Sequence, residues 1–346
     1  MTGARAAAVT ALLRISREGG YSPLVLEEIL NASALSESDR ALTTRLVYGV
    51  TERRLTLDFL LNRLSSTPVI KMDDTVREIL RVGVYQLVFL DKTPDFAAVN
   101  EAVALTRQRG FSRLTGYVNG VLRAAQRESA GLLAGLPPTD KGLELRYSCP
   151  RAWIRVWRAA YGEDLTRRLL ETLNDPPPAY IRVNTLKTTP EELTAVLREH
   201  GITVTPVTGL PAALEVSPAQ ALRRLPPEWQ DRFYWQDIAS QWCCRALSPR
   251  PGERIADVCA APGGKSMTVL QEMNGQGTVD ATDLHDDKCR IMAERAARYG
   301  IPGLSVTAAD ASAEPPTARI GAYDRVICDV PCSGLGVIRR KPEIRY

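Results

Sequence analysis

The feature that most constrains the fold of this chain is an alternation of strand-like and helix-like segments from about residue 236 onward. Four strand-like runs lie in this part of the chain, at 254–261, 277–283, 304–310 and 323–330. Helical segments at 262–273 and 286–300 separate the first three of them. Parallel strands need crossover connections, usually helices. We therefore predict that residues 236–346 form an α/β domain with a Rossmann-like parallel sheet. Ligands of such sheets bind at the carboxyl ends of the strands.

Residues 1–130 follow a different pattern, with apolar residues at the i, i+3 and i+4 spacing of amphipathic helices. Ser36 and Asp73 predict helix starts, and Gly110 predicts a helix end. The opening residues could be taken for a signal peptide, but their apolar stretch is short and runs into Arg14 and Arg17. We predict a compact all-helical domain instead.

The middle of the chain, 131–235, combines a linker with a small α+β unit. Residues 131–150 carry the turn residues of a linker. A strand-like run then precedes a helix that Pro190 opens and Gly201 closes, and two further strand-like runs follow. His200 is interpreted as a residue at the helix C-terminus and not as a ligand.

Composition excludes several classes of protein. The net charge of +4 is compatible with a nucleic-acid partner and too small to argue for one. Seven cysteines without a C-x-x-C pair disfavour a zinc knuckle or a thioredoxin-like site, and they fit a reduced, cytoplasmic location. The sequence has no run of eighteen apolar residues, so no membrane span is predicted. We expect no metal site and a monomer.

The stretch "DVCAAPGGKS", which begins at Asp257, is a glycine-containing turn between a strand and a helix. Gly263 and Gly264 leave backbone amides open to a ligand. A phosphate-binding P-loop would need glycine where Cys259 stands, so that interpretation fails. A nucleoside site needs a carboxylate about twenty residues on, at the end of the next strand. Asp283 lies nineteen residues after Gly264 and satisfies this requirement.

Two further carboxylates and a cysteine follow the later strands. Asp310 closes the third strand, where it is placed to reach the base of the same nucleoside, and Asp329 closes the fourth. Pro331 turns the chain out of the sheet, so Cys332 should enter the same crevice. We interpret four other cysteines as buried structural residues: Cys243, Cys244, Cys259 and Cys328.

A basic run follows Cys332, with Arg339, Arg340, Lys341 and Arg345. A run of this kind is usually a solvated face, but beside a nucleoside crevice it could neutralise RNA phosphates.

Together these motifs resemble a known family. "DVCAAPGGKS", "ATDLHDDK", "AAD" and "DVPCSGLGVIRRKPEI" resemble the S-adenosylmethionine-dependent RNA cytosine-C5 methyltransferases. "VREILRVGVYQLVFLDKTP", "AAVNEAV" and "YVNGVLR" resemble the NusB-like domain, which is joined to the methyltransferase in the RsmB (Sun) branch. "IRVNTLKTT" and "FYWQDIASQ" resemble the segment that binds RNA between the two. The resemblance implies 16S ribosomal RNA as the partner.

The resemblance also assigns roles. It implies that the cofactor S-adenosylmethionine is wrapped by the turn residues Cys259, Ala260, Ala261, Pro262, Gly263, Gly264 and Lys265. Asp283 would bind its ribose and Asp310 its adenine. Asp329 would lie between the methionine end of the cofactor and the target cytosine. Lys265 would lie near the reaction centre.

In the family's chemistry a cysteine thiolate adds to C6 of cytosine, and the resulting enamine attacks the methyl group through C5. The resemblance implies that Cys332 assists release of the product, while a cysteine in a Thr-Cys motif attacks. Residues 1–346 contain no Thr-Cys pair. We therefore expect a chain truncated after the fourth strand, without its nucleophile and inactive. Two alternatives remain: an RNA-binding module without catalysis, similar to an antitermination factor, and an enzyme that uses Cys332 itself as the nucleophile.

Overall fold

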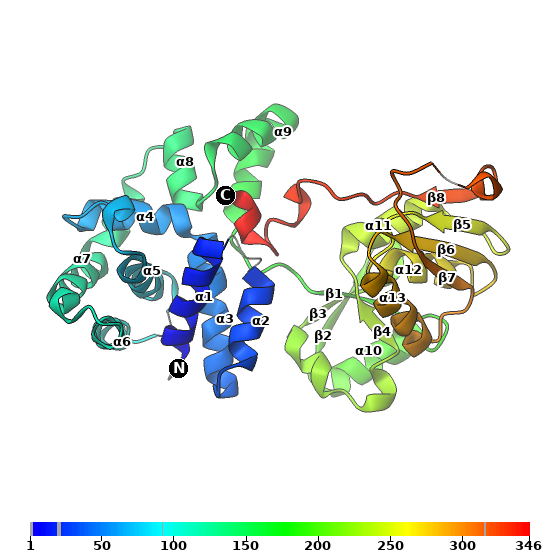
Figure 1. Ribbon diagram of the computed structural model, residues 1–346, viewed down its shortest axis with the longest axis horizontal. Helices are drawn as coiled ribbons and strands as arrows, with labels where there is room; N and C mark the ends of the chain where they lie inside the picture. The colour runs from blue at the N-terminus through cyan, green and yellow to red at the C-terminus, as the bar shows by residue number, and fades with distance from the viewer. Residues whose placement is uncertain (1–2, 19–21, 92, 315) are drawn as a thin grey trace. The chain divides into compact units, whose positions relative to one another are not determined.

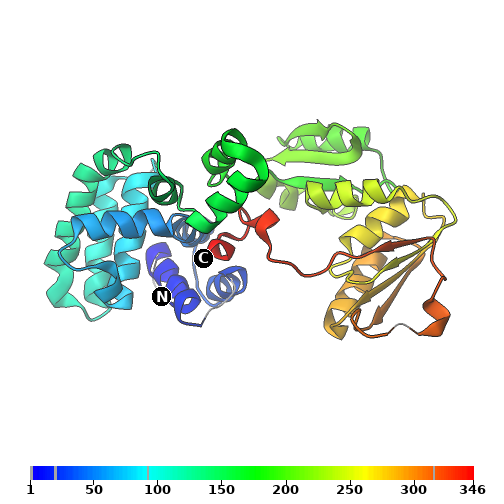
Figure 2. The ribbon, with the colours of Figure 1, turned by 90° about the horizontal axis from the view of Figure 1, so that it is seen from above.

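The computed structural model describes the chain except for residues 1–2, 19–21, 92 and 315. Contacts divide it into two compact units, Met1–Pro176 with Ser333–Tyr346, and Pro177–Cys332. Figure 1 and Figure 2 show their elements. None of the described helices is long and apolar enough to cross a membrane. The described residues also contain no group of three or more His, Cys, Asp or Glu side chains that could hold a metal ion.

The first unit is helical in its described residues. Its α-helices are α1 (Ala4–Glu18), α2 (Ser22–Asn31), α3 (Glu37–Glu52), α4 (Arg54–Leu64), α5 (Asp74–Phe89), α6 (Asp95–Gln108), α7 (Thr115–Ala134), α8 (Asp140–Tyr147) and α9 (Arg151–Thr172). Helix α5 contacts α1, α3, α4, α6 and α7, so it is the centre of the unit. A methyl group at Gly49 would overlap the Tyr85 ring, which explains why this position of α3 carries glycine.

The expected helix boundaries in this unit are confirmed. Ser36 caps α3 by accepting a hydrogen bond from Asp39 N, and Asp73 caps α5. Gly110 follows the end of α6 with a positive φ of 88°. The opening stretch that could be taken for a signal peptide lies largely within α1, whose leucines and most of whose alanines are buried.

The predicted linker at 131–150 is wrong in its local structure. Helix α7 continues to Ala134, and α8 begins after Thr139, whose hydroxyl accepts from Gly142 N at 3.3 Å. The proline pair before Thr139 suggested a loop, but it only separates two helices. Helix α9 was not predicted at all. The domain boundaries at 130 and 235 stay predictions.

The second unit contains two sheets. The first is antiparallel in the order β2-β3-β1-β4, formed by β1 (Tyr180–Val183), β2 (Thr203–Val207), β3 (Leu210–Ser217) and β4 (Phe233–Trp235). Helix α10 (Pro190–Glu199) packs on it, and His200 is the C-cap of that helix, as expected. This is the predicted small α+β unit.

The second sheet is parallel in the order β7-β6-β5-β8, as predicted. Its strands are β5 (Arg254–Asp257), β6 (Thr278–Asp283), β7 (Leu304–Ala308) and β8 (Arg325–Ile327). The helices that accompany this sheet are α11 (Ile238–Leu247), α12 (Gly264–Glu272) and α13 (Asp286–Tyr299) (Figure 1).

Buried polar side chains join α12 to the antiparallel sheet. Gln271 on α12 accepts from Arg182 Nε at 3.0 Å and donates to Asn184 Oδ1 at 3.1 Å. Tyr234 shares a hydrogen bond of 2.9 Å with Thr268 of the same helix. Each of these groups is buried and paired, which is what makes such a polar contact specific. The helix that begins at the glycine turn is therefore fixed to the antiparallel sheet by several buried side chains.

Candidate active site

The glycine turn connects β5 to α12 at the carboxyl end of the parallel sheet. Gly263 is the N-cap of α12 with φ 89°, a left-handed conformation that favours glycine, and a methyl group there would lie 2.7 Å from Met292 Cγ. At Gly264 a methyl group would meet only Gln236 Nε2, at 3.6 Å. The backbone of the turn is therefore open at Gly264, as a site for a ligand requires.

Asp283 lies against this turn. It is the last residue of β6, and its Oδ2 accepts a hydrogen bond from Ala261 N at 3.2 Å. The neighbouring Ala260 N donates to Thr282 O at 2.9 Å. Because β5 and β6 are paired in parallel register, the turn and the strand-end carboxylate are brought together by the sheet itself. The spacing of nineteen residues between Gly264 and Asp283 predicted this proximity.

Asp257 is a buried carboxyl beneath the same turn, and the sequence analysis assigned it no role. It is 1% exposed, and its Oδ2 accepts from Ser266 Oγ at 2.6 Å. Burial raises its pKa to about 6, although the Ser266 hydroxyl and the Lys265 ammonium oppose the rise. Its Oδ1 is buried without a hydrogen-bond partner of normal geometry among the described residues. The only signal in the sequence was its place at the head of the quoted motif.

Lys265 and Asp329 form an ion pair across the sheet. Lys265 is the second residue of α12, and Asp329 follows β8 by two residues. The lysine side chain is 17% exposed and the aspartate 55%. The structure thus brings together two of the predicted reaction-centre residues, although Asp329 lies just beyond the strand and not within it.

Asp310 is placed differently. It follows β7 by two residues, is exposed, and accepts from Ser312 N at 2.8 Å and Ser312 Oγ at 2.7 Å. The Ser312 hydroxyl lowers its pKa, with the Ser312 N–H contributing next. Asp310 therefore shapes its own loop, while Ala309 N donates to Asp283 O at 2.9 Å and keeps that loop beside β6.

The cysteines correct part of the sequence interpretation. Cys332 is exposed in the segment after β8, and its place in the crevice stays a prediction. Cys244 is buried, and burial raises its pKa to about 12, as suits a structural thiol. Cys259, which was also predicted as buried, is partly exposed, and burial followed by the nearby Cys328 raises its pKa.

Cys243 and Cys328 are exposed and were wrongly predicted as buried. Strand β8 ends at Ile327, one residue before Cys328. On α11 Cys243 lies about 100° around the helix from the buried Cys244, so the two neighbours face different environments.

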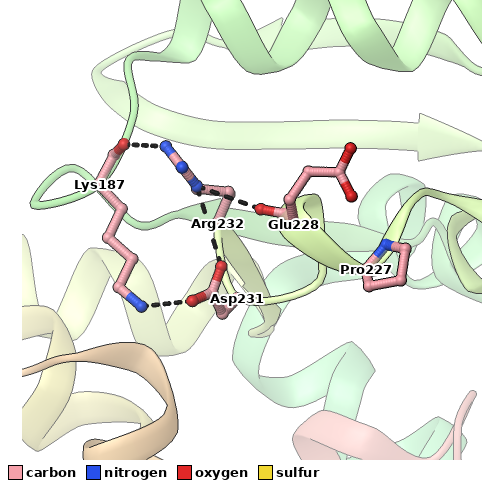
Figure 3. Close-up of a pocket in the computed structure, with 5 residues that line it drawn as sticks. All are labelled: Lys187, Pro227, Glu228, Asp231 and Arg232. Carbon is pink, nitrogen blue, oxygen red and sulfur yellow. Dashed lines mark hydrogen bonds and ion pairs between the residues drawn. The ribbon is translucent and has the colours of Figure 1, made fainter.

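A separate cavity of about 480 Å³ lies on the loops of the antiparallel sheet and contains none of the predicted site residues (Figure 3). It is lined by Lys187, Pro227, Glu228, Asp231 and Arg232. Lys187 is ion-paired with Asp231, and Arg232 donates to Glu228 O at 3.3 Å. Its charges are matched within the cavity, which makes it a weaker candidate than the crevice at the strand ends.

Comparison with known proteins agrees with this architecture. Family models match at residues 2–127 (NusB family), 149–223 (Methyltr_RsmF/B-like, ferredoxin-like domain) and 244–346 (16S rRNA methyltransferase RsmB/F). The crystal structure of a methyltransferase homolog protein from Pyrococcus horikoshii has a TM-score of 0.50 at 26% identity and covers 59% of this chain and 67% of its own. The crystal structure of PH0851, at 23% identity, shares the fold with a TM-score of 0.75 over 98% of this chain and 77% of its own.

Curated relatives match along the whole chain. The probable ribosomal RNA small subunit methyltransferase B of Synechocystis is 34% identical, with 100% of this chain and 78% of the relative covered. That of Bacillus subtilis is also 34% identical, with 100% and 77% covered. The ribosomal RNA small subunit methyltransferase B of Escherichia coli is 31% identical, with 99% and 77% covered. With a NusB domain, a ferredoxin-like unit and a methyltransferase sheet in this order, the chain belongs to the ribosomal RNA small subunit methyltransferase B family.

Proposed function

We propose that this protein transfers a methyl group from S-adenosylmethionine to C5 of a cytosine in 16S ribosomal RNA. The observation that carries the proposal is the hydrogen bond from Ala261 N to Asp283 Oδ2, which holds this carboxylate beside an open glycine turn. The chain's membership of the methyltransferase B family supplies the substrate class. The proposed cytoplasmic location follows from that substrate.

The residues fit the cofactor. Open backbone at Gly264 and the carboxylate of Asp283 match a nucleoside with a charged amino-acid end, and the unpartnered Oδ1 of Asp257 leaves an acceptor beneath the turn. When bound, S-adenosylmethionine supplies an electrophilic methyl group on a sulfonium. We propose that residues 259–265 hold it, that Asp283 accepts from its ribose hydroxyls, and that Asp310 turns from Ser312 to its adenine.

On the RNA side, we propose that Asp329 accepts a hydrogen bond from the N3/N4 edge of the cytosine. Lys265, which is ion-paired with Asp329, orients this carboxylate. A thiolate bonded to C6 must leave again after methylation: a base takes the C5 proton, the C5–H electrons form the C5–C6 double bond, and the C6–S bond breaks. We propose that Cys332 assists this last step and that a thiol outside residues 1–346 makes the attack.

The test is methyl transfer from labelled cofactor to unmodified 16S RNA, with residues 1–346 compared with a protein extended at its C-terminus. We expect turnover only in the longer protein, with loss of turnover when its Thr-Cys cysteine is replaced. Robust turnover by residues 1–346 that disappears in Cys332→Ser would instead make Cys332 the nucleophile. Absence of turnover in both proteins, with RNA binding intact, would favour the binding-module alternative.

The RNA partner has a test of its own. Binding through phosphates releases counterions, so the affinity for a 16S RNA fragment should fall steeply with salt, by about 10³-fold between about 50 and about 200 mM if about six phosphates are contacted. Filter binding across this range measures the slope. A flat salt dependence would contradict phosphate recognition by this chain.

A further inference from the structure

The segment that follows Cys332 is built into the helical unit. Residues 333–346, here called the strap, belong to the first unit, whereas Cys332 is the last residue of the second. Leu335, Ile338 and Ile344 of the strap pack in one apolar cluster with side chains of the helical unit, namely Cys149, Ile154, Trp157, Leu170 and Leu173. Ile338 is only 5% exposed. The strap is therefore part of a core and not a loose connection.

Arg345 is the polar anchor of the strap. It is 2% exposed, and its Nη1 donates to Asn174 Oδ1 at 2.7 Å and to Glu52 O at 3.2 Å, while Nη2 donates to Leu173 O at 3.0 Å. Glu52 is the last residue of α3, and Leu173 is the C-cap of α9. The carbonyl groups at helix C-termini lack partners within the helix and attract positive charge. One guanidinium thus donates to one carbonyl group at the end of each of two helices.

Two other contacts fix the strap along its length. Arg339 Nη2 donates to Asp175 O at 3.2 Å and to Pro176 O at 3.1 Å, directly after α9. Trp153 Nε1 on α9 donates to Arg345 O at 3.1 Å. Burial of the guanidinium lowers the pKa of Arg345, so the hydrogen bonds have to offset a real desolvation cost. An anchor of this kind is specific in its geometry, since any shift leaves buried groups unpaired.

The anchor lies close to Cys332 along the chain. Only three residue steps separate Cys332 from Leu335, the first strap residue in the apolar cluster. Three residues span at most about 10 Å, so the chain keeps Cys332 within that distance of Leu335. Gly334, with φ 74°, lies within this link, and a methyl group there would lie 2.8 Å from Ile344 Cδ1.

We propose that the strap positions Cys332. Arg345 of the strap and Trp153 of α9 are the positioning residues, because they fix the strap to the helical unit. The helical unit then contributes to the site, because it holds the chain on the downstream side of the thiol. The proposal rests on the role of Cys332 in product release proposed above. If that role is correct, loosening the strap should impair release in the same way as removing the thiol.

The experiment compares Arg345→Met, Trp153→Phe and Cys332→Ala in the protein extended at its C-terminus. Met preserves much of the side-chain length without the hydrogen bonds, and Phe keeps an aromatic ring but lacks the indole N–H. Arg127→Ala, which removes an exposed arginine of α7 in the same unit, is the matched control. The readouts are turnover, affinity for S-adenosylmethionine, the fraction of RNA covalently attached to protein after denaturation, and the rate of tryptic cleavage after Arg340.

We expect Arg345→Met to lower turnover about tenfold and to raise the covalent RNA–protein fraction several-fold, as in Cys332→Ala, with cofactor affinity unchanged. Tryptic cleavage after Arg340 should accelerate. Trp153→Phe should show the same changes at smaller size, which keeps the test valid if Arg345→Met does not fold. Arg127→Ala should change none of them.

Three outcomes discriminate between the two proposals. A rise of the covalent fraction in Cys332→Ala but not in the strap variants would overturn the positioning role and leave the function intact. No rise in Cys332→Ala would remove the proposed role of Cys332, and the positioning proposal with it. Turnover and covalent fraction that fall together in the strap variants would show that the strap only stabilises the fold.

Discussion

The two sides of the candidate site differ in how far the fold has already fixed their side chains. On the β5–β6 side Asp257 is buried, and Asp283 is hydrogen-bonded to the backbone of the glycine turn. On the β8 side Asp329 is mostly exposed, and both Cys328 and Cys332 are exposed. The groups of the first side are thus held in place by the protein itself. The second presents its groups outward, as recognition of a large RNA substrate requires.

The cause of the difference lies in the strands. Strand β6 is six residues long, and it pairs with β5 on one side and β7 on the other. Strand β8 is three residues long, and among the described strands it pairs with β5 alone. A short edge strand leaves its carboxyl end free of neighbours, so the groups that follow it are exposed. The burial of the site's groups therefore decreases from β5 and β6 toward β8.

The largest expected effect is the contribution of Asp257 to the pH dependence of the protein's stability. Its folded pKa of about 6 lies above the ordinary value of 3.8, so the folded state holds the proton more tightly than the unfolded state. Its contribution to stability is therefore present below about pH 4 and is lost as the pH rises to about 6. This difference corresponds to at most about 3 kcal/mol. Asp257→Asn should not show the loss.

Urea unfolding of the wild type and Asp257→Asn at about pH 4 and about pH 7.5 measures this change. The stability of the variant relative to the wild type should increase with pH. Asp280→Asn is the opposite control: burial raises the pKa of Asp280, but hydrogen bonds from Arg254 and Tyr323 outweigh it and lower the pKa overall. A pH-independent difference between Asp257→Asn and the wild type would show that this side of the site is not buried as described.

The second test compares the carboxylate at the end of β6 with the one in the loop after β7 by cofactor affinity. Asp283→Ala should weaken S-adenosylmethionine binding by about 1–3 kcal/mol, the effect of losing a hydrogen bond to a charged group in a preformed site. Asp310→Ala should cost less, because Asp310 must first give up its bonds to Ser312. Calorimetric titration gives both values. Equal losses would contradict a site that is preorganised only at β6, and unchanged affinity in Asp283→Ala would remove Asp283 from the site.

Much of this architecture could be predicted from the sequence, because buried strands and amphipathic helices repeat apolar residues with a definite period. The prediction failed at α9, where Val156 and Tyr161 are exposed although Ile154 and Trp157 are buried. Apolar residues there occur on more than one face, so the helical period is obscured. The adjacent α8 was hidden for a different reason, since its start follows directly on two prolines.

The site was predictable only where spacing along the chain determines position in space. Asp283 was found because parallel strands align their carboxyl ends. The burial of Asp257, the exposure of Cys328 and the anchoring of Arg345 depend on contacts between distant segments. The guanidinium of Arg345 reaches Glu52, almost three hundred residues away in sequence. A basic run in the sequence suggested a solvated or RNA-binding face, but the structure buries Arg345 at the ends of two helices.

The smallest expected effect is on stability at the Lys265–Asp329 pair. Asp329 is 55% exposed, so solvent screens the attraction, and such pairs contribute about 0–1 kcal/mol. Asp329→Asn should therefore lower the free energy of unfolding by less than about 1 kcal/mol. The exposed helix pair Arg290–Glu294 supplies the matched control, through Glu294→Gln. Catalysis should respond differently, because Asn keeps the size of the side chain but loses the charge that we propose acts on the cytosine. Urea unfolding and labelled-methyl transfer by the extended protein separate the two effects. A large loss of stability in Asp329→Asn would mean that the β8 side is as rigid as the β6 side, and the difference between them would disappear.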